Sequence, residues 1–282
     1  MKKERLTLVP VGGIANRMRT IASAYQLCAD ANVDLRIIWF RDRALNAPFN
    51  KIFNFAYDNI FVKEATMIDH LVNDRPRLKN LFFPRIGQFL TFDSTIYEKE
   101  IEQLRQMNFD FGEWVKDKRC YMASYNEFGQ LDDEIYRKLF IPVEIVRQKV
   151  EKYVSMFSTN TIGIHIRRTD NVRAIQMSPV ELFMEKAEEE FSNNNNTKIF
   201  LATDDEYVKK TFKSRFADKI ITSMNLADRN SIIGIQDGLA ELYTLARTSK
   251  IYGSAWSSFS EIAAKIGNIE LEIILKNHSN HS

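Results

Sequence analysis

The chain has 282 residues, of which 45% are hydrophobic, and its 39 Lys and Arg against 37 Asp and Glu leave a net charge of only +2. This length and composition are typical of globular proteins, with enough material for two modest domains or one large α/β domain. The near-neutral charge argues against bulk attraction to nucleic acid or to anionic membrane as the main activity, so we expect no nucleic-acid partner and at most peripheral membrane contact.

The two cysteines, Cys28 and Cys120, are too few for a disulfide framework and lack metal-ligand spacing. This usage favours a reducing compartment, and Cys28 is expected in the core of a helix. The apolar run at residues 6–9 is too short for a signal sequence or a membrane span. We therefore expect a cytoplasmic protein.

The first forty residues predict a βαβ unit. Residues 5–11 have the pattern of a buried strand, Gly12 and Gly13 break it, a one-sided helical pattern covers 14–31, and a second strand covers 34–40. A glycine turn before a helix amino terminus can bind phosphate through backbone N–H groups. The spacing is not the G-x-G-x-x-G fingerprint, so nicotinamide binding is not supported, and a plain tight turn remains the alternative.

The middle of the chain, residues 41–147, shows no clean alternation of strands and helices. Acid-rich helical patterns such as 96–107 occur there, 120–124 is consistent with a strand, and 128–140 with a loop and short helix. Its many aromatic residues are typical of a core. An irregular insertion between two regular halves is also where an enzyme would place acceptor recognition.

A strand predicted at residues 162–167 organises the second half. Its three isoleucines share one face, and His165 and Arg167 share the other. The strand ends in the charged run Arg167-Arg168-Thr169-Asp170. Because a guanidinium is costly to desolvate unless it meets an anion, this run predicts an anion site, with a solvated strand end as the alternative.

Regular alternation continues to the end of the chain, which predicts a parallel sheet with helices on both faces. Ser178 has the position of an N-cap for the helix that runs to about residue 191. The remaining predicted elements are a helix at 143–157, a loop through 177, strands at 198–202, 219–222 and 250–253, and helices at 206–216, 232–248 and 257–266.

Ligands of such sheets bind beyond the carboxyl ends of the strands. The strand exits here carry glycine or polar residues, and Ser257 and Ser258 at a helix start could bond phosphate oxygens, with ordinary capping as the alternative. Asp204 and Asp205 are adjacent and so point to opposite faces. This favours a ribose or helix-capping role over a metal pair.

Three motifs in order carry a resemblance to a known family. Gly-Gly-Ile-Ala-Asn-Arg-Met begins at Gly12, His-Ile-Arg-Arg-Thr-Asp begins at His165, and a run from Glu241 leads into Ser-Ser-Phe-Ser-Glu-Ile-Ala at Ser257. Together they resemble the GDP-fucose fucosyltransferase superfamily, most closely the α1,6 branch and its rhizobial nodulation relatives. The resemblance covers both ends of the chain and all of residues 160–267, but not the middle of the first half.

The resemblance implies an α/β fold of the GT-B type, with two Rossmann-like domains facing each other across a donor cleft. Residues 1–145 would form the acceptor-side domain and residues 146–282 the nucleotide-sugar-binding domain. It implies transfer of fucose from GDP-fucose to a glycan or lipid-linked saccharide in polysaccharide biosynthesis. Fixed cationic and backbone donors can stabilise the departing diphosphate, so we expect an inverting reaction without metal or other cofactor.

The resemblance also implies roles for individual residues. Arg167 corresponds to the catalytic arginine on the donor β-phosphate, and His165 to the guanine-side histidine. Glu241 corresponds to the acidic residue on guanine, with Asp237 as the competing residue. The other expected donor contacts are Gly12, Gly13 and Asn16 in the loop over the pyrophosphate, Ser257 and Ser258 on the phosphates, and Arg168 and Asp204 nearby.

One departure concerns the general base. The α1,6 enzymes place a Lys directly after the aspartate of this motif and a Glu a few residues later, whereas this chain has Asn171 and no carboxylate in 172–176. Asp170 is then the nearest base, and a base from the 41–147 insertion remains open. Two other functions also remain open: a GT-B transferase that uses another nucleotide sugar, and a non-catalytic protein that binds a nucleotide or sugar.

Overall fold

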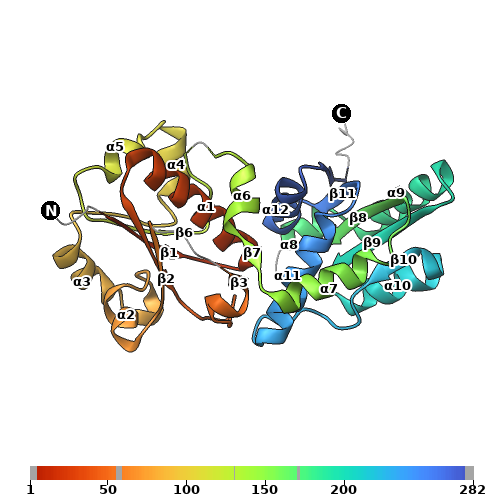
Figure 1. Ribbon diagram of the computed structural model, residues 1–282, viewed down its shortest axis with the longest axis horizontal. Coiled ribbons are helices and arrows are strands. Elements are labelled where there is room, and N and C mark those ends of the chain that lie inside the picture. The colour runs from red at the N-terminus through yellow and green to blue at the C-terminus, as the bar shows by residue number, and fades with distance from the viewer. Residues whose placement is uncertain (1–4, 55–58, 130, 170–171, 277–282) are drawn as a thin grey trace. The chain divides into compact units, whose positions relative to one another are not determined.

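The computed structural model describes residues 5–54, 59–129, 131–169 and 172–276 (Figure 1). The chain divides into two compact units, Met1–Ile141 and Pro142–Ser282, whereas the sequence boundary was expected after residue 145. Within the described ranges, no helix is both long and apolar enough to cross a membrane.

The first unit is built on a parallel sheet in the order β4-β2-β1-β6-β5. Helix α1 begins directly after the glycine turn, and Met18, Ile21 and Cys28 on it are buried, as the apolar spacing predicted. The strands are β1 (Arg5–Pro10), β2 (Asp34–Trp39), β4 (Ile60–Glu64), β5 (Ser94–Ile96) and β6 (Cys120–Ser124). The other elements are α1 (Ile14–Ala31), η1 (Phe49–Lys51), β3 (Phe53–Asn54), α2 (Met67–Val72), η2 (Leu78–Asn80), α3 (Pro84–Thr91), α4 (Ile101–Gln106), α5 (Phe111–Val115), α6 (Glu134–Leu139) and β7 (Ile141–Pro142).

The supposedly irregular middle segment completes this sheet, which corrects the sequence interpretation. The predicted strand at 120–124 is β6, but β4 and β5 were missed. β4 lies at one sheet edge and is only partly buried, and β5 has three residues, so neither leaves a clear hydrophobic pattern. The helix predicted at 96–107 is confirmed as α4, but its start was wrong, because β5 ends at Ile96 and α4 begins only at Ile101.

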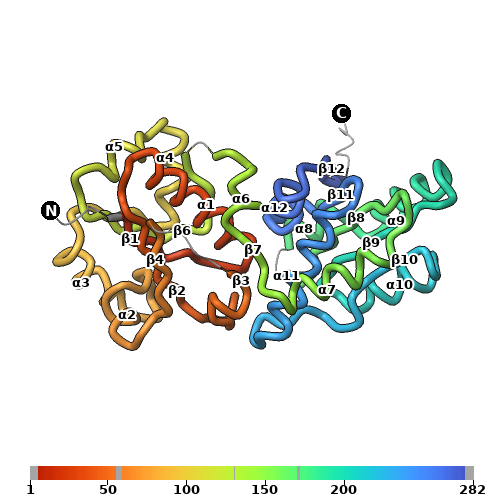
Figure 2. Tube along the Cα trace, viewed as in Figure 1, coloured from red at the N-terminus to blue at the C-terminus, as the bar shows by residue number. Residues whose placement is uncertain are grey.

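The second unit is built on a parallel sheet in the order β10-β9-β8-β11-β12. β8 lies beside β9 and β11, as the tube trace shows (Figure 2). The strands are β8 (Asn160–Ile166), β9 (Thr197–Thr203), β10 (Ile220–Thr222), β11 (Lys250–Ser254) and β12 (Glu270–Ile274). The helices are α7 (Glu144–Val154), α8 (Val172–Met177), α9 (Val180–Asn193), α10 (Glu206–Phe216), η3 (Ala217–Lys219), α11 (Ile232–Leu245) and α12 (Ser258–Gly267).

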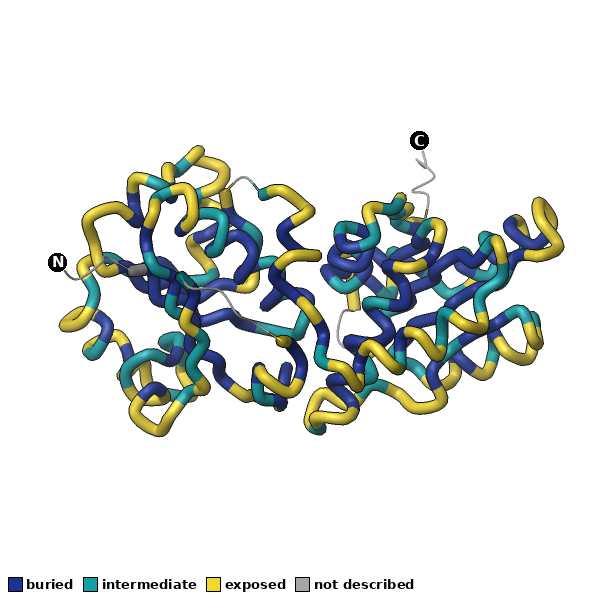
Figure 3. The backbone as a smooth tube through the Cα atoms, viewed as in Figure 1, coloured by how far each residue is buried: buried dark blue, intermediate teal, exposed yellow. Residues whose placement is uncertain are grey.

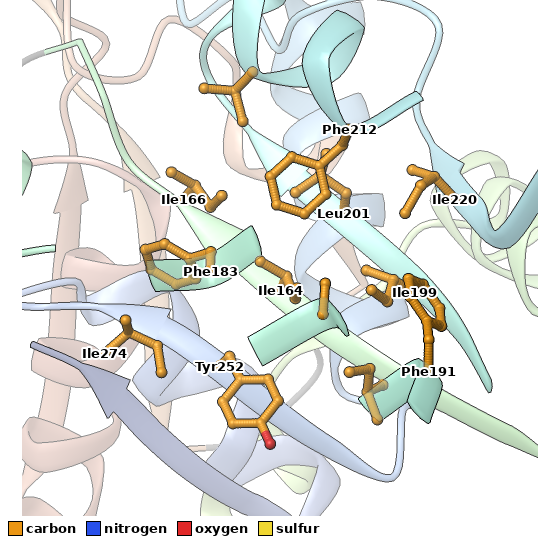
Figure 4. Packing of buried hydrophobic residues seen from close by; sticks show 13 residues of the cluster. Ile164, Ile166, Phe183, Phe191, Ile199, Leu201, Phe212, Ile220, Tyr252 and Ile274 are labelled. Carbon is orange, nitrogen blue, oxygen red and sulfur yellow. The ribbon is translucent and has the colours of Figure 1, made fainter. Parts of the chain in front are cut away.

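Both faces of the second sheet are covered, as predicted. On one face the three isoleucines of β8 pack with Phe183 of α9 and Phe212 of α10 in a fully buried cluster (Figure 4). On the other face, α11 approaches β8 so closely that a Cβ on Gly163 would lie 2.8 Å from Leu245 Cδ2. Gly163 is therefore required for helix–sheet contact.

Three details of the second unit differ from the sequence interpretation. Helix α8 stands where a loop was expected, and β12 was missed. Ser178 is not an N-cap: its Oγ donates to the Ile274 carbonyl at 2.6 Å and accepts from the Ala255 N–H at 3.0 Å. Pro179 occupies the N-cap position of α9 instead. These contacts join residues about 80 to 100 positions apart, which local sequence patterns do not report.

The strand order places a topological switch point between β8 and β11. From β8 the chain adds β9 and β10 on one side, then crosses to add β11 and β12 on the other. Helices on the two sides leave from opposite faces, and ligands of such sheets bind beyond the carboxyl ends of the two central strands. β1 and β6 occupy the corresponding positions in the first sheet.

Candidate functional site

The exits of β8 and β11 are joined at the switch point by one hydroxyl. Ser254 Oγ donates to the His165 carbonyl at 3.3 Å and accepts from the Arg167 N–H at 3.1 Å. His165 also pairs with Gly253 in the sheet register. The backbone that carries Arg167 is therefore fixed relative to β11.

His165 is held as a neutral imidazole. Its ring stacks on Phe259 with centroids 4.8 Å apart, and its Nδ1 lies 3.4 Å from Ser257 Oγ. Burial lowers the pKa of His165 to about 4, with the negative charge of Asp204 opposing this shift and the positive charge of Arg167 adding to it. At neutral pH the side chain can therefore offer one ring nitrogen as an acceptor and one as a donor.

Helix α12 starts beside this histidine. Ser257 is its N-cap residue, with extended backbone, but the Ser257 side chain makes no capping hydrogen bond and lies against His165. Ser258 is the first helical residue, so the first-turn N–H groups of a ten-residue helix lie at the switch point. An uncapped helix amino terminus with two hydroxyls is suited to bind an anion.

Asp204 positions the loop that follows β8. Its carboxylate accepts from the Arg168 N–H at 2.7 Å and from Thr169 Oγ1 at 2.6 Å. The neighbouring Asp205 instead caps α10, accepting from the Val208 N–H at 3.0 Å. The helix-capping alternative is thus confirmed for Asp205, while Asp204 orders the loop next to Arg167. Burial lowers the pKa of the Arg168 guanidinium, and nearby carboxylates oppose this shift.

Glu241 lies in a buried polar network. It is 5% exposed and accepts a hydrogen bond from Ser223 Oγ. Lys209, also buried, donates to Ser223 Oγ at 2.7 Å and to the Asn225 carbonyl at 2.8 Å. Burial raises the pKa of Glu241 to about 7, against the opposing effects of Ser223 and Lys209. Burial likewise lowers the pKa of Lys209.

Asp237, one helical turn before Glu241, lines an open hollow of about 180 Å³. Its carboxylate pairs with Lys149 of α7. Ser223 also lines the hollow, so Ser223 stands between the hollow and Glu241. The remaining lining residues are Lys152, Tyr153, Met224 and Asn225.

In the first unit, the glycine loop lies between β1 and α1. Gly12 has φ +88°, a left-handed value, and a Cβ there would lie 2.8 Å from Asn16 Nδ2, whereas a Cβ on Gly13 would meet nothing within 4 Å. Arg17 fixes this loop: it is buried, donates to the Gly12 carbonyl at 2.8 Å and to the Phe40 carbonyl at 2.6 Å. Burial lowers the pKa of Arg17 to about 10, which leaves it charged.

The structure brings most predicted residues of the second unit to one end of its sheet. Asp170 and Asn171 lie outside the described residues, so the predicted base is not placed. Sequence reasoning missed Arg17, Ser254 and the Lys209–Ser223 pair. Arg17 and Ser254 stand inside motifs already singled out, whereas Lys209 and Ser223 carry no local signal because their partners come from separate elements.

Comparisons with known proteins point in one direction. The family model for the N- and catalytic domains of α-(1,6)-fucosyltransferase matches residues 134–233. No curated protein sequence matches the chain. The match to the family model covers 100 of the 282 residues, including β8 with His165, the Arg167 that follows it, and the start of α11.

Solved structures share the fold across nearly the whole chain. NodZ α-1,6-fucosyltransferase soaked with GDP-fucose has a TM-score of 0.68 at 18% identity, covering 99% of this chain and 97% of its own; the same protein is described from Bradyrhizobium. Arabidopsis thaliana FUT1 in complex with GDP has a TM-score of 0.63 at 15% identity, covering 99% and 71%. POFUT1 in complex with GDP has a TM-score of 0.58 at 13% identity, covering 96% and 99%.

Proposed function

We propose that this chain transfers fucose from GDP-fucose to a glycan acceptor. The family model confirms its resemblance to the GDP-fucose fucosyltransferase superfamily, and its fold is that of GT-B fucosyltransferases. The observation that carries the proposal is the cluster at the switch point between β8 and β11. There His165, the Arg167 backbone and the amino terminus of α12 are tied together by Ser254 and Ser257.

The donor diphosphate would lie at the amino terminus of α12. Ser257 and Ser258 would donate hydroxyl and N–H hydrogen bonds, and the Arg167 guanidinium would bind the β-phosphate. Gly12, Gly13 and Asn16 are proposed for the pyrophosphate on the strength of the sequence resemblance.

The guanine base is assigned to the hollow lined by Asp237. Of the two competing acids, Asp237 faces this hollow, whereas Glu241 lies behind Ser223. A carboxylate can accept from the N1 and N2 hydrogens of guanine together, which uracil and adenine do not offer in that arrangement. Asp237 is therefore the proposed base-reading residue, and Glu241 supports Ser223.

The reaction would proceed by direct displacement. An acceptor hydroxyl oxygen attacks C1 of fucose, the bond between C1 and the β-phosphate oxygen breaks, and GDP leaves with the bonding electron pair. The hydroxyl proton passes to a base, for which Asp170 is proposed. Charge on the departing diphosphate would be stabilised by Arg167 and the helix amino terminus, so the reaction is proposed to be inverting and independent of metal.

Isothermal titration with GDP and GDP-fucose, with and without EDTA, tests donor binding. The expected result is binding of both ligands that EDTA leaves unchanged, followed by a fucosylated product of inverted configuration in NMR spectra of the reaction. Absence of GDP binding would contradict the proposal, and binding that EDTA abolishes would contradict its metal-independent form.

A transferase that uses a different nucleotide sugar is the second possibility. Competition among GDP, UDP and ADP separates the two, since the proposed base site predicts a clear preference for GDP that Asp237→Asn removes. A protein that binds donor but neither hydrolyses nor transfers it across a glycan array would be the non-catalytic alternative.

We also propose a cytoplasmic location and a role in polysaccharide biosynthesis, with a glycan or lipid-linked saccharide as acceptor. Cys28 and Cys120, both in the described part of the first unit, are free and buried, which supports a reducing compartment. Expression of a tagged chain in its own cell, followed by fractionation, tests the location.

A further inference from the structure

Helices α2 and α3 and the turn between them expose a dense set of apolar side chains. Of the 24 large apolar residues that are exposed among the described residues, 10 fall within the 24 positions from 67 to 90. Figure 3 shows both helices with much of their length coloured as exposed. These 10 residues form what we call the α2–α3 apolar surface: Met67, Ile68, Leu71, Leu78, Leu81, Phe82, Phe83, Ile86, Phe89 and Leu90.

The two helices are inverted relative to ordinary surface helices, which bury apolar side chains and expose polar ones. The buried residues here are Asp69 in α2 and, in α3, Gln88 and the first-turn Pro84, so two of the three are polar. Gln88 donates to the Asp74 carbonyl at 2.9 Å and accepts from Tyr97 Oη at 2.8 Å. A pair of helices that hydrogen-bonds its buried polar side chains and exposes its apolar ones is suited to bind an apolar partner.

Helices α2 and α3 pack against each other. Val72 of α2 packs against Gly87 of α3, where a Cβ would lie 3.1 Å from Val72 Cβ. Within α3, Ile86, Phe89 and Leu90 are three and four residues apart and so share a face. The apolar residues are therefore gathered on two packed helices and the turn between them, and are not scattered singly.

The turn before α3 holds two apolar residues in an unfavourable backbone conformation. Leu81 has φ +49° and is 85% exposed, and Phe82 has φ +56° and is 43% exposed. Left-handed conformations are rare for bulky residues and destabilise the chain. The fold thus presents these side chains outward despite a free-energy penalty.

The exposed charges over this stretch are of one sign. Between Thr66 and Thr91 the carboxylates are Asp69 and Asp74, and both are buried and paired, with Lys63 and Arg77 respectively. The exposed charged side chains of this fully described stretch are Lys79 and Arg85. Three acids flank it: Glu64 is exposed and accepts from the Phe49 N–H at 2.7 Å, Glu98 pairs with Arg75, and Asp93 is exposed and pairs with Arg119.

We propose that the α2–α3 apolar surface docks the protein onto a lipid bilayer that contains anionic lipids. Apolar side chains would enter the boundary between headgroups and acyl chains, while Lys79 and Arg85 meet lipid phosphates. A second copy of the chain is the competing occupant, and it would bring the exposed Lys79 and Arg85 of both copies to one interface. The docking does not depend on the proposed enzymatic function.

If the acceptor is lipid-linked, docking would bring the first unit to the surface that holds it; this consequence alone rests on the proposed function.

Vesicle flotation tests the docking with the full chain. We expect flotation with phosphatidylcholine vesicles containing about one quarter phosphatidylglycerol, and weaker flotation with phosphatidylcholine alone, because anionic lipid attracts Lys79 and Arg85. Leu81→Ser with Phe89→Ser, and separately Lys79→Glu with Arg85→Glu, should each lower partitioning roughly tenfold or more.

Tyr207→Ser and Lys213→Glu on α10 are matched controls, since both side chains are exposed in the second unit, and they should float as the wild type does. Thermal unfolding confirms that every variant is folded. The proposal is overturned if the wild type does not float, if the α2–α3 variants float like the controls, or if light scattering shows a dimer in solution that Leu81→Ser with Phe89→Ser dissociates.

Discussion

His165 of β8 stacks on Phe259 of α12 with ring planes 28° apart, so the central strand of the second sheet and the helix that begins at the switch point are locked together. This contact buries the imidazole and brings its Nδ1 to 3.4 Å from Ser257 Oγ. The position of the α12 amino terminus is thus set by the same residue that is expected beside guanine.

We predict that His165 stays neutral across the physiological range. Burial places its pKa at about 4, below the ordinary 6.5, so its NMR resonances should not titrate between pH 6 and 8. In the unfolded chain it takes up a proton near pH 6.5, so the stability it contributes is present above that pH and falls as pH drops toward 4. The His165 resonance is assigned as the imidazole signal that His165→Gln lacks. A titration midpoint near pH 6.5 for this resonance would contradict the prediction.

Arg167→Ala should lose roughly 100-fold or more of transfer activity, because a cation at the departing diphosphate acts in the transition state. Arg167→Lys should recover only part of it, since the bidentate fork is lost. The melting temperature should change little, because the backbone N–H that bonds Ser254 remains. Arg247→Ala, which removes an exposed arginine paired with Glu151, is the control. Unfolding of Arg167→Ala would instead assign this arginine a structural role.

The two glycines of the first loop should respond differently to alanine. Gly12→Ala forces a side chain into a left-handed conformation against Asn16 and should destabilise the chain by about 1–2 kcal/mol. Gly13→Ala meets open space and should leave stability within about 0.5 kcal/mol of wild type. Chemical denaturation measures both. Weaker GDP binding by a stable Gly13→Ala variant would show that the Gly13 backbone approaches the ligand. Equal losses of stability in the two variants would contradict the prediction that only Gly12 needs to be glycine for the fold.

Asp204 and Asp205 offer a matched pair. Asp204→Ala leaves the Arg168 N–H and Thr169 hydroxyl without their acceptor and should destabilise the chain by about 1–3 kcal/mol while weakening GDP binding. Asp205→Ala removes a helix cap and should lower stability by about 1 kcal/mol with GDP affinity unchanged. Calorimetry of both variants compares the two effects. Wild-type affinity in Asp204→Ala would show that the loop it orders has no part in donor binding.

The effect of Glu241→Gln on the free energy of unfolding should depend on pH, and it should be more favourable at pH 8 than at pH 5. Burial raises the pKa of Glu241 in the folded protein to about 7 from an ordinary 4.5. Between about pH 4.5 and pH 7, the folded protein therefore keeps the Glu241 proton, whereas the unfolded chain has released it. Stability from this group is present below about pH 4.5 and is lost as pH rises toward 7, a change of about 3 kcal/mol. The difference between wild type and variant in denaturation midpoints at the two pH values isolates this effect.

Glutamine can still accept from Ser223, so GDP affinity of Glu241→Gln should match the wild type. A variant that loses GDP binding while Asp237→Asn keeps it would reverse the proposed assignment of the base site.

The sequence by itself determined the regular parts of this protein. Hydrophobic periodicity gave the range of α1 at 14–31 and of α10 at 206–216, and the isoleucine alternation gave the buried face of β8. These features depend on residues two to four positions apart, so local patterns suffice. The same reasoning placed polar residues at strand exits, and the resemblance to the fucosyltransferases proposed a role for each of them.

Only the tertiary structure decided how those residues are used. It placed β4 and β5 in the first sheet, made Ser178 a link between β11 and β12, and set Ser223 between Asp237's hollow and Glu241. Each of these relations joins segments distant in the chain, and a hydrogen bond or strand pairing of that kind leaves no periodic trace in the sequence. Gln88 of α3 is a further case, because its buried amide finds the Asp74 carbonyl and Tyr97 Oη only in the fold.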